Sequence, residues 1–424
     1  MDVKPGYKQT EVGFIPNDWG TYTLLGLSRQ IMDYRGRTPK KLGMDWGGGD
    51  IPALSAGNVK MGFVDFSAEC YFGSEALYGK WMGQGDVAKD DILFTTEAPL
   101  GNVALVPDER KYILSQRTIL LKPRQEIASS KFLFQLLLSD EFQRMLKDYS
   151  SGSTAKGIQR KKLEQLFVAV PPLSEQYAIA RALSDVDALL DSLDRLIAKK
   201  RNLKQAAMQQ LLTGQTRLPG FSGEWEEKRL GDLGVTYGGL TGKTKADFGN
   251  GEARYITFMN VMQNVVIDSE TFDRVEVSQI ETQNRARKGD LFFNGSSETP
   301  EEVALCAVLL YEVQDVYLNS FCFGFRFRED VAANGIFFAY YLRGPVGREL
   351  MKSLAQGSTR YNLSKVALLN SSLLLPTPLE QAAIAEVLTG MDTELVSLEQ
   401  RRNKTAALKQ GMMQELLTGR TRLV

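Results

Sequence analysis

One stretch of the sequence occurs twice, first from Pro171 to Leu218 and again from Pro376 to Leu423. The two copies align without a gap, so that Glu175 matches Glu380 at an offset of 205 residues, and half of the aligned positions are identical. An identity of this size indicates an internal duplication, which constrains the fold more strongly than any other feature of the chain. A chain of 424 residues built in this way is expected to contain two similar domains.

Each copy of the repeat predicts one long helix. Prolines open each copy and end the segment before it, Ser174 stands at the expected N-cap, and Gly214 and Gly419 follow the expected helix ends. Apolar residues recur at spacings of three and four, which is the pattern of a coiled-coil seam. The seam residues are Ile179, Leu183, Leu190 and Leu193 in the first copy and Ile384, Leu388, Leu395 and Leu398 in the second.

The two helices are expected to pack on each other as an antiparallel pair, because one helix cannot bury its apolar stripe alone. About 38 residues at 1.5 Å each make a rod of roughly 55–60 Å. The seam becomes polar at Lys200, Lys204, Arg402 and Thr405. Basic residues there favour a solvated face with i,i+4 pairing, and contact with DNA phosphates or a partner subunit is the alternative. Two unrelated bundle helices remain a further alternative.

Composition excludes several classes of function. The formal net charge is zero, which weighs against a protein that grips nucleic acid unaided. The chain contains no histidine, which removes imidazole bases and histidine metal sites, and we predict neither a metal site nor catalytic residues. Three cysteines without paired spacing indicate a reducing compartment. The sequence has no membrane-spanning run and no signal peptide, so a cytoplasmic protein is expected.

The segments outside the repeat predict two globular domains of mixed α/β (α+β) type. The expected division is residues 1–170, 171–218, 219–375 and 376–424, with a domain and a helix in each half. Both domains show the same order of short strands, then one helix (130–146 in the first domain), then a polar turn and a final strand. Trp19 and Trp225 occupy matching positions, and Trp19 is expected to anchor the packing of its loop.

The helices keep their sequence, whereas the polar loops of the two domains differ. Thr95 and Thr96 stand opposite Asn294 and Gly295, for example. A duplicated spacer that carries two divergent domains is the arrangement expected for bipartite recognition of DNA. Half-sites on one face of B-DNA lie about 34–36 Å apart per turn, a separation that a rod of this length can span.

Two other functions compete with this interpretation. The run GGLTGKT (238–244) resembles a phosphate-binding P-loop, but Gly238 stands one residue too close to the Gly-Lys pair. An enzyme with a nucleotide site at Lys243 would bind ATP, and Lys243→Ala would abolish that binding. A scaffold whose helices join partner proteins without reading DNA is the second alternative.

The run from Leu173 to Leu233, with its LSEQ, LLTG and TRLPGF motifs, resembles the central region of specificity subunits of type I restriction-modification systems. The second copy of the repeat resembles the second such region of that family, and the opening GYKQTEVGFIPNDW is also typical of it. The resemblance covers the whole chain. The motif that runs from Glu-Gln to LLTG is highly specific for the family.

The resemblance implies two target-recognition domains, each of which reads half of a bipartite site in double-stranded DNA. The antiparallel helices would set the spacer and dock two modification subunits. These partners would use S-adenosylmethionine to methylate adenine N6. Two restriction subunits, which use ATP and Mg²⁺ to translocate and cut DNA, could join the complex. This chain itself would bind no cofactor and would have no catalytic activity.

We expect polar loop residues to contact DNA, since sequence readout needs donors and acceptors in the groove. The candidates in the first domain are Lys40, Lys41, Thr95, Thr96, Lys156 and Gln159. The candidates in the second domain are Lys243, Lys245, Asn294, Ser296, Ser297, Arg360, Tyr361 and Asn362.

Overall fold

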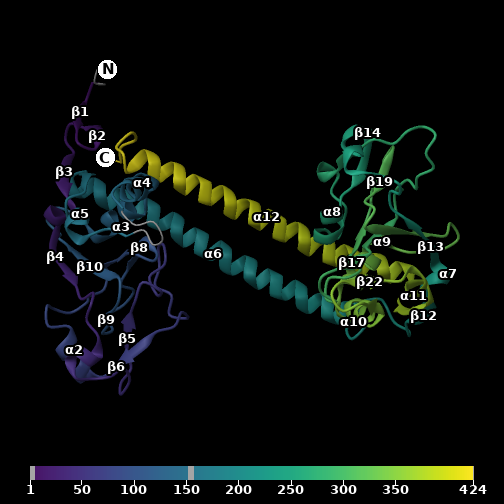
Figure 1. Ribbon diagram of the computed structural model, residues 1–424, viewed down its shortest axis with the longest axis horizontal. Helices are drawn as coiled ribbons and strands as arrows, with labels where there is room; N and C mark the ends of the chain where they lie inside the picture. The colour runs from purple at the N-terminus through teal and green to yellow at the C-terminus, as the bar shows by residue number, and fades with distance from the viewer. Residues whose placement is uncertain (1–4, 151–156, 424) are drawn as a thin grey trace. The chain divides into compact units, whose positions relative to one another are not determined.

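The computed structural model describes residues 5–150 and 157–423. The chain divides into two compact units, residues 1–194 with 401–424 and residues 195–400. Each unit consists of one globular domain and half of each long helix, α6 (Leu173–Leu211) and α12 (Pro378–Leu416), which are teal and yellow in Figure 1. The expected mixed α/β class, with two similar domains and two long helices, is confirmed.

Both predicted helices form, and each contains 39 residues. Gly214 and Gly419 adopt the left-handed conformation expected after a helix, with φ of 71° and 73°. The N-cap prediction was wrong, because α6 begins at Leu173 and Ser174 therefore lies within the helix. At the matching end of α12 the cap is Thr377, whose side chain accepts a hydrogen bond from the Glu380 amide.

The two helices pack antiparallel within each unit. In the first unit, Lys409 contacts Asp187 at 2.6 Å and Arg402 contacts Asp194 at 3.0 Å. Residue numbers therefore rise along α6 while those of the partners fall along α12, as in an antiparallel pair. Lys200 contacts Glu394 at 2.7 Å in the second unit. These basic side chains thus pair across the helices, and the expectation of pairing within one helix was wrong for them. Of the seam residues, Ile179, Leu183, Leu193, Ile384, Leu388 and Leu395 are buried, and Leu190 and Leu398 are half-buried.

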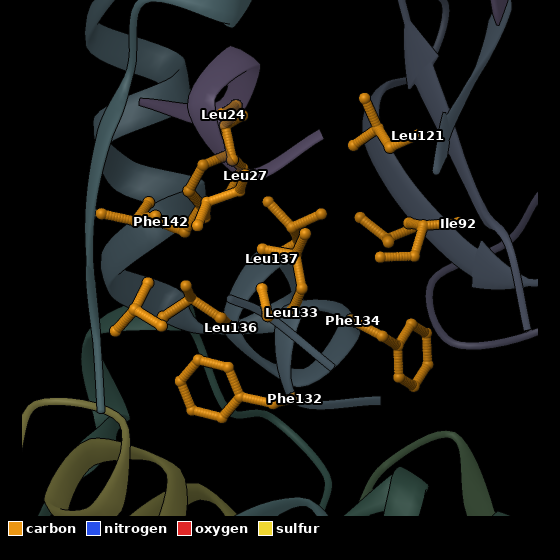
Figure 2. Packing of buried hydrophobic residues seen from close by; sticks show 14 of the residues in the cluster. Leu24, Leu27, Ile92, Leu121, Phe132, Leu133, Phe134, Leu136, Leu137 and Phe142 are labelled. Atoms are coloured by element: carbon orange, nitrogen blue, oxygen red, sulfur yellow. The ribbon is translucent and has the colours of Figure 1, made fainter. Parts of the chain in front are cut away.

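A four-stranded antiparallel sheet, in the order β4-β10-β7-β8, forms the centre of the first unit. Alternate side chains of its strands enter two different cores, as the neighbours Ile31 and Met32 illustrate. The first core lies against α3, α4 and the start of α6. Figure 2 shows part of it, with Leu133 and Leu137 of α3 near Ile92 of the sheet. The second core lies under the small sheet β6-β5-β9 and α2.

The strands of the first unit are β1 (Tyr7–Thr10), β2 (Gly13–Pro16), β3 (Gly20–Thr23), β4 (Ser28–Asp33), β5 (Ile51–Leu54), β6 (Tyr71–Gly73), β7 (Ile92–Thr96), β8 (Leu100–Leu105), β9 (Ile113–Leu114), β10 (Thr118–Pro123) and β11 (Phe167–Val170). Its shorter helices are α1 (Leu24–Leu27), η1 (Pro39–Leu42), α2 (Glu75–Trp81), α3 (Ser130–Leu138), α4 (Asp140–Asp148) and α5 (Arg160–Glu164). Two further pairs of strands, β1-β2 and β11-β3, are antiparallel.

The second unit repeats this plan with a sheet in the order β13-β20-β16-β18. Its core contains Phe293, Phe325 and Phe337 together with Ile384 and Leu388 of α12. The sheet β15-β14-β19 and helix α8 surround a further core. A third small sheet, β17-β22-β21, follows the end of β16. In the first unit, a bridge between Glu97 and Gly157 stands at the place of β17-β22.

The strands of the second unit are β12 (Glu226–Arg229), β13 (Gly234–Gly238), β14 (Phe248–Ile256), β15 (Asp273–Val275), β16 (Leu291–Asn294), β17 (Ser296–Ser297), β18 (Cys306–Val308), β19 (Val316–Leu318), β20 (Cys322–Phe327), β21 (Ala355–Gln356), β22 (Tyr361–Leu363) and β23 (Ser372–Leu375). Its shorter helices are α7 (Leu230–Leu233), η2 (Lys245–Asp247), α8 (Phe258–Gln263), η3 (Ser269–Thr271), α9 (Gly335–Arg343), α10 (Pro345–Leu354) and α11 (Lys365–Asn370).

The single helix predicted over 130–146 is two helices. Ser139 has extended backbone angles and separates α3 from α4, and its hydroxyl accepts a hydrogen bond from the Phe142 amide. Gly344 separates α9 from α10 in the same way, and Pro345 opens the second helix. Helical periodicity continues across both breaks, so a pattern of apolar residues cannot reveal them.

A buried glutamate joins each domain to the long helices. In the first latch (Glu175, Arg422 and Trp19), the Arg422 guanidinium donates to both carboxylate oxygens of Glu175, at 2.7 and 2.8 Å. The Trp19 indole N–H donates to the same carboxylate at 3.1 Å, and Glu175 is 1% exposed. These hydrogen bonds, with those to Asp18, raise the pKa of Arg422.

The second latch (Glu380, Arg217 and Trp225) repeats the ion pair in the other unit, where the Arg217 guanidinium lies over the Trp225 ring but the Trp225 indole N–H has no hydrogen-bond partner among the described residues. The glutamine after each glutamate adds a further contact. Gln176 accepts a hydrogen bond from the Ser129 amide before α3, and Gln381 accepts one from the Asn334 amide before α9. The Glu-Gln pairs and the arginines of the two TRL runs therefore fix each domain to the helices, and the predicted anchoring role of Trp19 is confirmed.

Candidate nucleic-acid interface

Polar side chains gather at one end of the central sheet in the first unit. Because the sheet is antiparallel, β4 and β7 end there and β10 and β8 begin there, with Asp33 opposite Ile119 and Thr95 opposite Thr118. We call Asp33, Arg35, Thr96, Glu97 and Arg117 the first edge. Loops at a sheet end carry binding residues more often than the sheet itself, because the scaffold holds them rigidly.

Ion pairs organise the first edge. The Arg35 guanidinium donates to both carboxylate oxygens of Asp33, at 2.9 and 2.6 Å, and to the Thr96 hydroxyl at 2.9 Å. Burial opposes ionisation of Asp33, but its hydrogen bonds with Arg35 hold the pKa of Asp33 below the ordinary value. Arg117 and Glu97 are about half exposed and lie 3.4 Å apart. The first edge thus presents both charges to solvent.

The matching end of the second sheet has the same backbone framework. The Thr96 amide donates to the Arg117 carbonyl at 3.0 Å, and the Gly295 amide donates to the Phe321 carbonyl at 2.8 Å. Similarly, the Ile158 amide donates to the Thr96 carbonyl, as the Leu363 amide does to that of Gly295.

The side chains on this shared framework differ. We call Ser296, Ser297, Phe321, Arg360 and Asn362 the second edge. Phe321 is 61% exposed, and the Arg360 guanidinium donates to the Ser296 hydroxyl at 3.2 Å. The second edge therefore offers an aromatic ring, a cation and an amide where the first edge offers two ion pairs.

The DNA contacts predicted in the first unit fall into two groups. Lys40, Lys41 and Gln159 are exposed, in η1 and before α5, where a ligand can reach them. Thr95 and Thr96 are fully buried, which contradicts their selection as surface contacts. The Thr95 hydroxyl accepts a hydrogen bond from the Asn102 amide and thereby positions the following strand. Lys156 lies outside the described residues.

The predictions in the second unit divide in the same way. Arg360, Asn362 and Lys245 are exposed, and Tyr361 is half-buried. Asn294 is fully buried and was wrongly selected as a surface residue, because its amide donates to the Ser296 and Glu302 carbonyls. Ser296 and Ser297 are 8% and 7% exposed, so they border the edge without projecting from it.

Lys243 has a structural partner. Its side chain is 6% exposed, and its ammonium group lies 2.6 Å from the Glu281 carboxylate. The hydrogen bond from Lys243 lowers the pKa of Glu281 to about 2. The loop leads into the three-residue η2, whereas a P-loop opens a helix whose N-terminus binds phosphate. This geometry does not support the alternative of a nucleotide site at Lys243.

Sequence reasoning missed five residues that the structure places on the edges, namely Asp33, Arg35, Glu97, Arg117 and Phe321. Arg35 lies a few residues before the predicted contacts Lys40 and Lys41, but nothing in the sequence indicated its pairing with Asp33. Arg117 and Phe321 immediately precede equivalent strands, β10 and β20, of the two sheets. Their exposure depends on which strands pair, and no local pattern records that.

Residues 5–150 and 157–423 contain no cluster of three or more cysteine or acidic side chains that could hold a metal ion. In the same residues, no helix combines the length and hydropathy needed to cross a bilayer. Cys70, Cys306 and Cys322 are free, and burial raises the pKa of the Cys322 thiol to about 12.

Similar proteins have known roles. The type I restriction enzyme MjaIX specificity subunit of Methanocaldococcus jannaschii is 25% identical over 288 residues. That match covers 63% of this chain and 63% of the relative, so it spans less than two thirds of the relative's length.

Solved structures share the fold. The S subunit of a type I restriction-modification system from M. genitalium superposes with a TM-score of 0.57 at 16% identity, over 98% of both chains. The HsdS subunit from Thermoanaerobacter tengcongensis gives a TM-score of 0.51 at 18% identity, over 96% of this chain and 98% of that one.

The profile of the type I restriction modification DNA specificity domain matches twice, at residues 16–200 and 222–408. Each match contains one globular domain and most of the long helix that follows it. Because these matches cover most of the sequence, the chain belongs to the family of type I restriction-modification DNA specificity proteins.

Proposed function

We propose that this chain selects the DNA sequence on which a type I restriction-modification complex acts, with each unit reading one half of a bipartite site. The observation that carries the proposal is the pair of edges, which share a backbone framework and differ in side chains. A duplicated fold with identical edges would read the same half-site twice. Different edges on one framework favour two different half-sites.

The helices would supply the spacer between the half-sites. Each contains 39 residues, which correspond to about 58 Å at 1.5 Å per residue. Ion pairs and buried apolar residues hold the helices to each other within each unit, and a latch holds each domain to its helix ends. A helical link would favour one spacing between the half-sites, whereas a flexible linker would tolerate many.

The partners follow from the family. We propose that two modification subunits dock on the helices, and that two restriction subunits can join them. S-adenosylmethionine, ATP and Mg²⁺ would act in those partners, with none of them bound by this chain, and the complex would work in the cytoplasm. The family supplies DNA recognition rather than catalysis. The zero net charge fits a reader whose partners provide much of the grip on DNA.

The test is the methylation pattern that this chain specifies. The chain is co-expressed with its modification subunit in a host without other adenine methylases, and methylated adenines are mapped by long-read sequencing. We expect one motif with two specified halves and an unspecified spacer. A continuous motif would contradict the assignment of one half-site to each unit. A stable, active complex without any motif would favour the scaffold alternative.

A further inference from the structure

Arg117 stands in an unusual conformation at the centre of the first edge. Its φ is 63°, in the left-handed region that residues other than glycine rarely adopt. Its carbonyl accepts hydrogen bonds from the amide and the hydroxyl of Thr96, at 3.0 and 3.3 Å, and these bonds hold the strained backbone in place. Strain that the surrounding structure maintains in this way is typical of functional positions.

The side chain of Arg117 is available to a ligand. It is 51% exposed, and its ion pair with Glu97, itself 48% exposed, is 3.4 Å long. A pair of exposed charges at this distance stabilises little, so both groups can exchange it for a ligand. The neighbouring Arg35, in contrast, already makes short bonds to Asp33 and Thr96.

The same framework position holds a different chemistry in the second unit. Phe321 immediately precedes β20, as Arg117 immediately precedes β10, and the carbonyl of each residue accepts a hydrogen bond from the corresponding backbone amide. Phe321 is 61% exposed, although an aromatic side chain of this size is usually buried. One position thus projects a guanidinium from one unit and a bare ring from the other, which is the difference expected where two half-sites are distinguished.

We propose that Arg117 and Glu97 together read one G·C pair in the half-site of the first unit, an inference that rests on the proposed function. The arginine fork matches the guanine O6 and N7 acceptors in the major groove, and a carboxylate accepts the N4–H of the paired cytosine. A site built only to hold phosphate would not place Glu97 beside the cation, because the carboxylate repels phosphate. At the equivalent place, Phe321 makes apolar contact with bases of the other half-site.

Arg117→Gly is the main variant, because glycine adopts a φ of 63° without strain and the framework is kept. Arg117→Lys keeps the positive charge but loses the two parallel N–H donors of the guanidinium. Arg110→Ala is the matched control, since Arg110 is also an exposed, ion-paired arginine of the first unit and lies beyond the other end of β8. Each variant is assembled with the modification subunit, and methylation is compared for all four bases at every position of the motif.

We expect Arg117→Gly to lose about 5- to 150-fold of the preference for G·C at one position of one half-site. Arg117→Lys should lose part of it, Glu97→Gln should admit other bases at the same position, and Arg110→Ala should match the wild type. The intact second half-site reports that the variants fold and assemble. An unchanged motif, or an equal loss on all sequences with a weaker salt dependence, would overturn the proposal and leave the two-half-site function standing. A wild-type chain without a split motif would refute the proposed function itself.

Discussion

Removing Arg422 should destabilise the first unit much more than removing Arg402, an exposed arginine of the same unit. Arg422→Ala leaves Glu175, which is 1% exposed, without its cationic partner. Breaking a buried ion pair by removing one partner costs about 3–5 kcal/mol. Because the Arg422 side chain is 26% exposed and solvent screens part of the interaction, we expect about 3 kcal/mol.

Arg402→Ala is the matched control. Arg402 pairs with Asp194 at 3.0 Å, but the two side chains are 40% and 52% exposed, so the loss should be about 0–1 kcal/mol. The double variant Glu175→Gln/Arg422→Met should recover much of the stability lost in Arg422→Ala, because it leaves no unpaired charge in the interior.

Native-state hydrogen exchange of the amides of residues 176–183 measures this effect where it occurs. A cost of about 3 kcal/mol corresponds to a fall in protection of roughly 100-fold. The amides of residues 381–388, beside the second latch, provide the internal reference and should keep their protection. An equal loss of protection in Arg422→Ala and Arg402→Ala would refute the argument that the burial of Glu175 makes the loss of its partner Arg422 costly.

Three further predictions concern other residues. Trp19→Phe should lower the free energy of unfolding in urea titrations by about 1.5–3 kcal/mol more than Trp225→Phe does. Of these two tryptophans, only Trp19 has a hydrogen-bond partner for its indole N–H within residues 5–150 and 157–423, so equal losses would contradict the prediction. The pKa of Glu281 is about 2 against an ordinary 4.5, so its pairing with Lys243 should stabilise the loop above about pH 4.5 and be lost as the pH falls through 2. Unchanged hydrogen exchange of residues 241–247 between pH 5 and 2 would exclude that pairing. Arg343→Met should destabilise the second unit by about 1–3 kcal/mol per orphaned carbonyl in urea titrations, because its guanidinium binds the Val261, Met262 and Asn264 carbonyls at the end of α8, and an unaltered midpoint would refute this role.

The duplication and the helical seam could be predicted because they depend on spacing alone. Ile179 and Leu183 are buried where the seam placed them, and Gly214 closes its helix with a positive φ. The side-chain contacts that join the helices to the domains could not be predicted. In the sequence, Glu175 stood out only as a position that both copies of the repeat share, because Arg422 lies 247 positions away and only the fold brings the two residues together.

The edges show why loop residues were harder to predict. Thr95 and Asn294 are polar and stand at strand ends, where a sequence pattern favours a surface contact. Both are buried, because the irregular backbone beyond the strand leaves donors and acceptors that a short polar side chain must satisfy. The exposed side chains at this place are Arg117 and Phe321 instead. Their equivalence follows from the register of the strands and not from similarity of sequence.

Exchange of one domain tests the central claim most directly. Residues 219–375 are replaced by the corresponding domain of another family member with a known target, and the methylation motif of the resulting complex is mapped beside that of the wild type. We predict that one half of the motif changes to the donor's half-site, while the other half and the spacer length are retained. A motif that changes in both halves, or in neither, despite a stable and active complex, would contradict the account that each unit reads its own half-site.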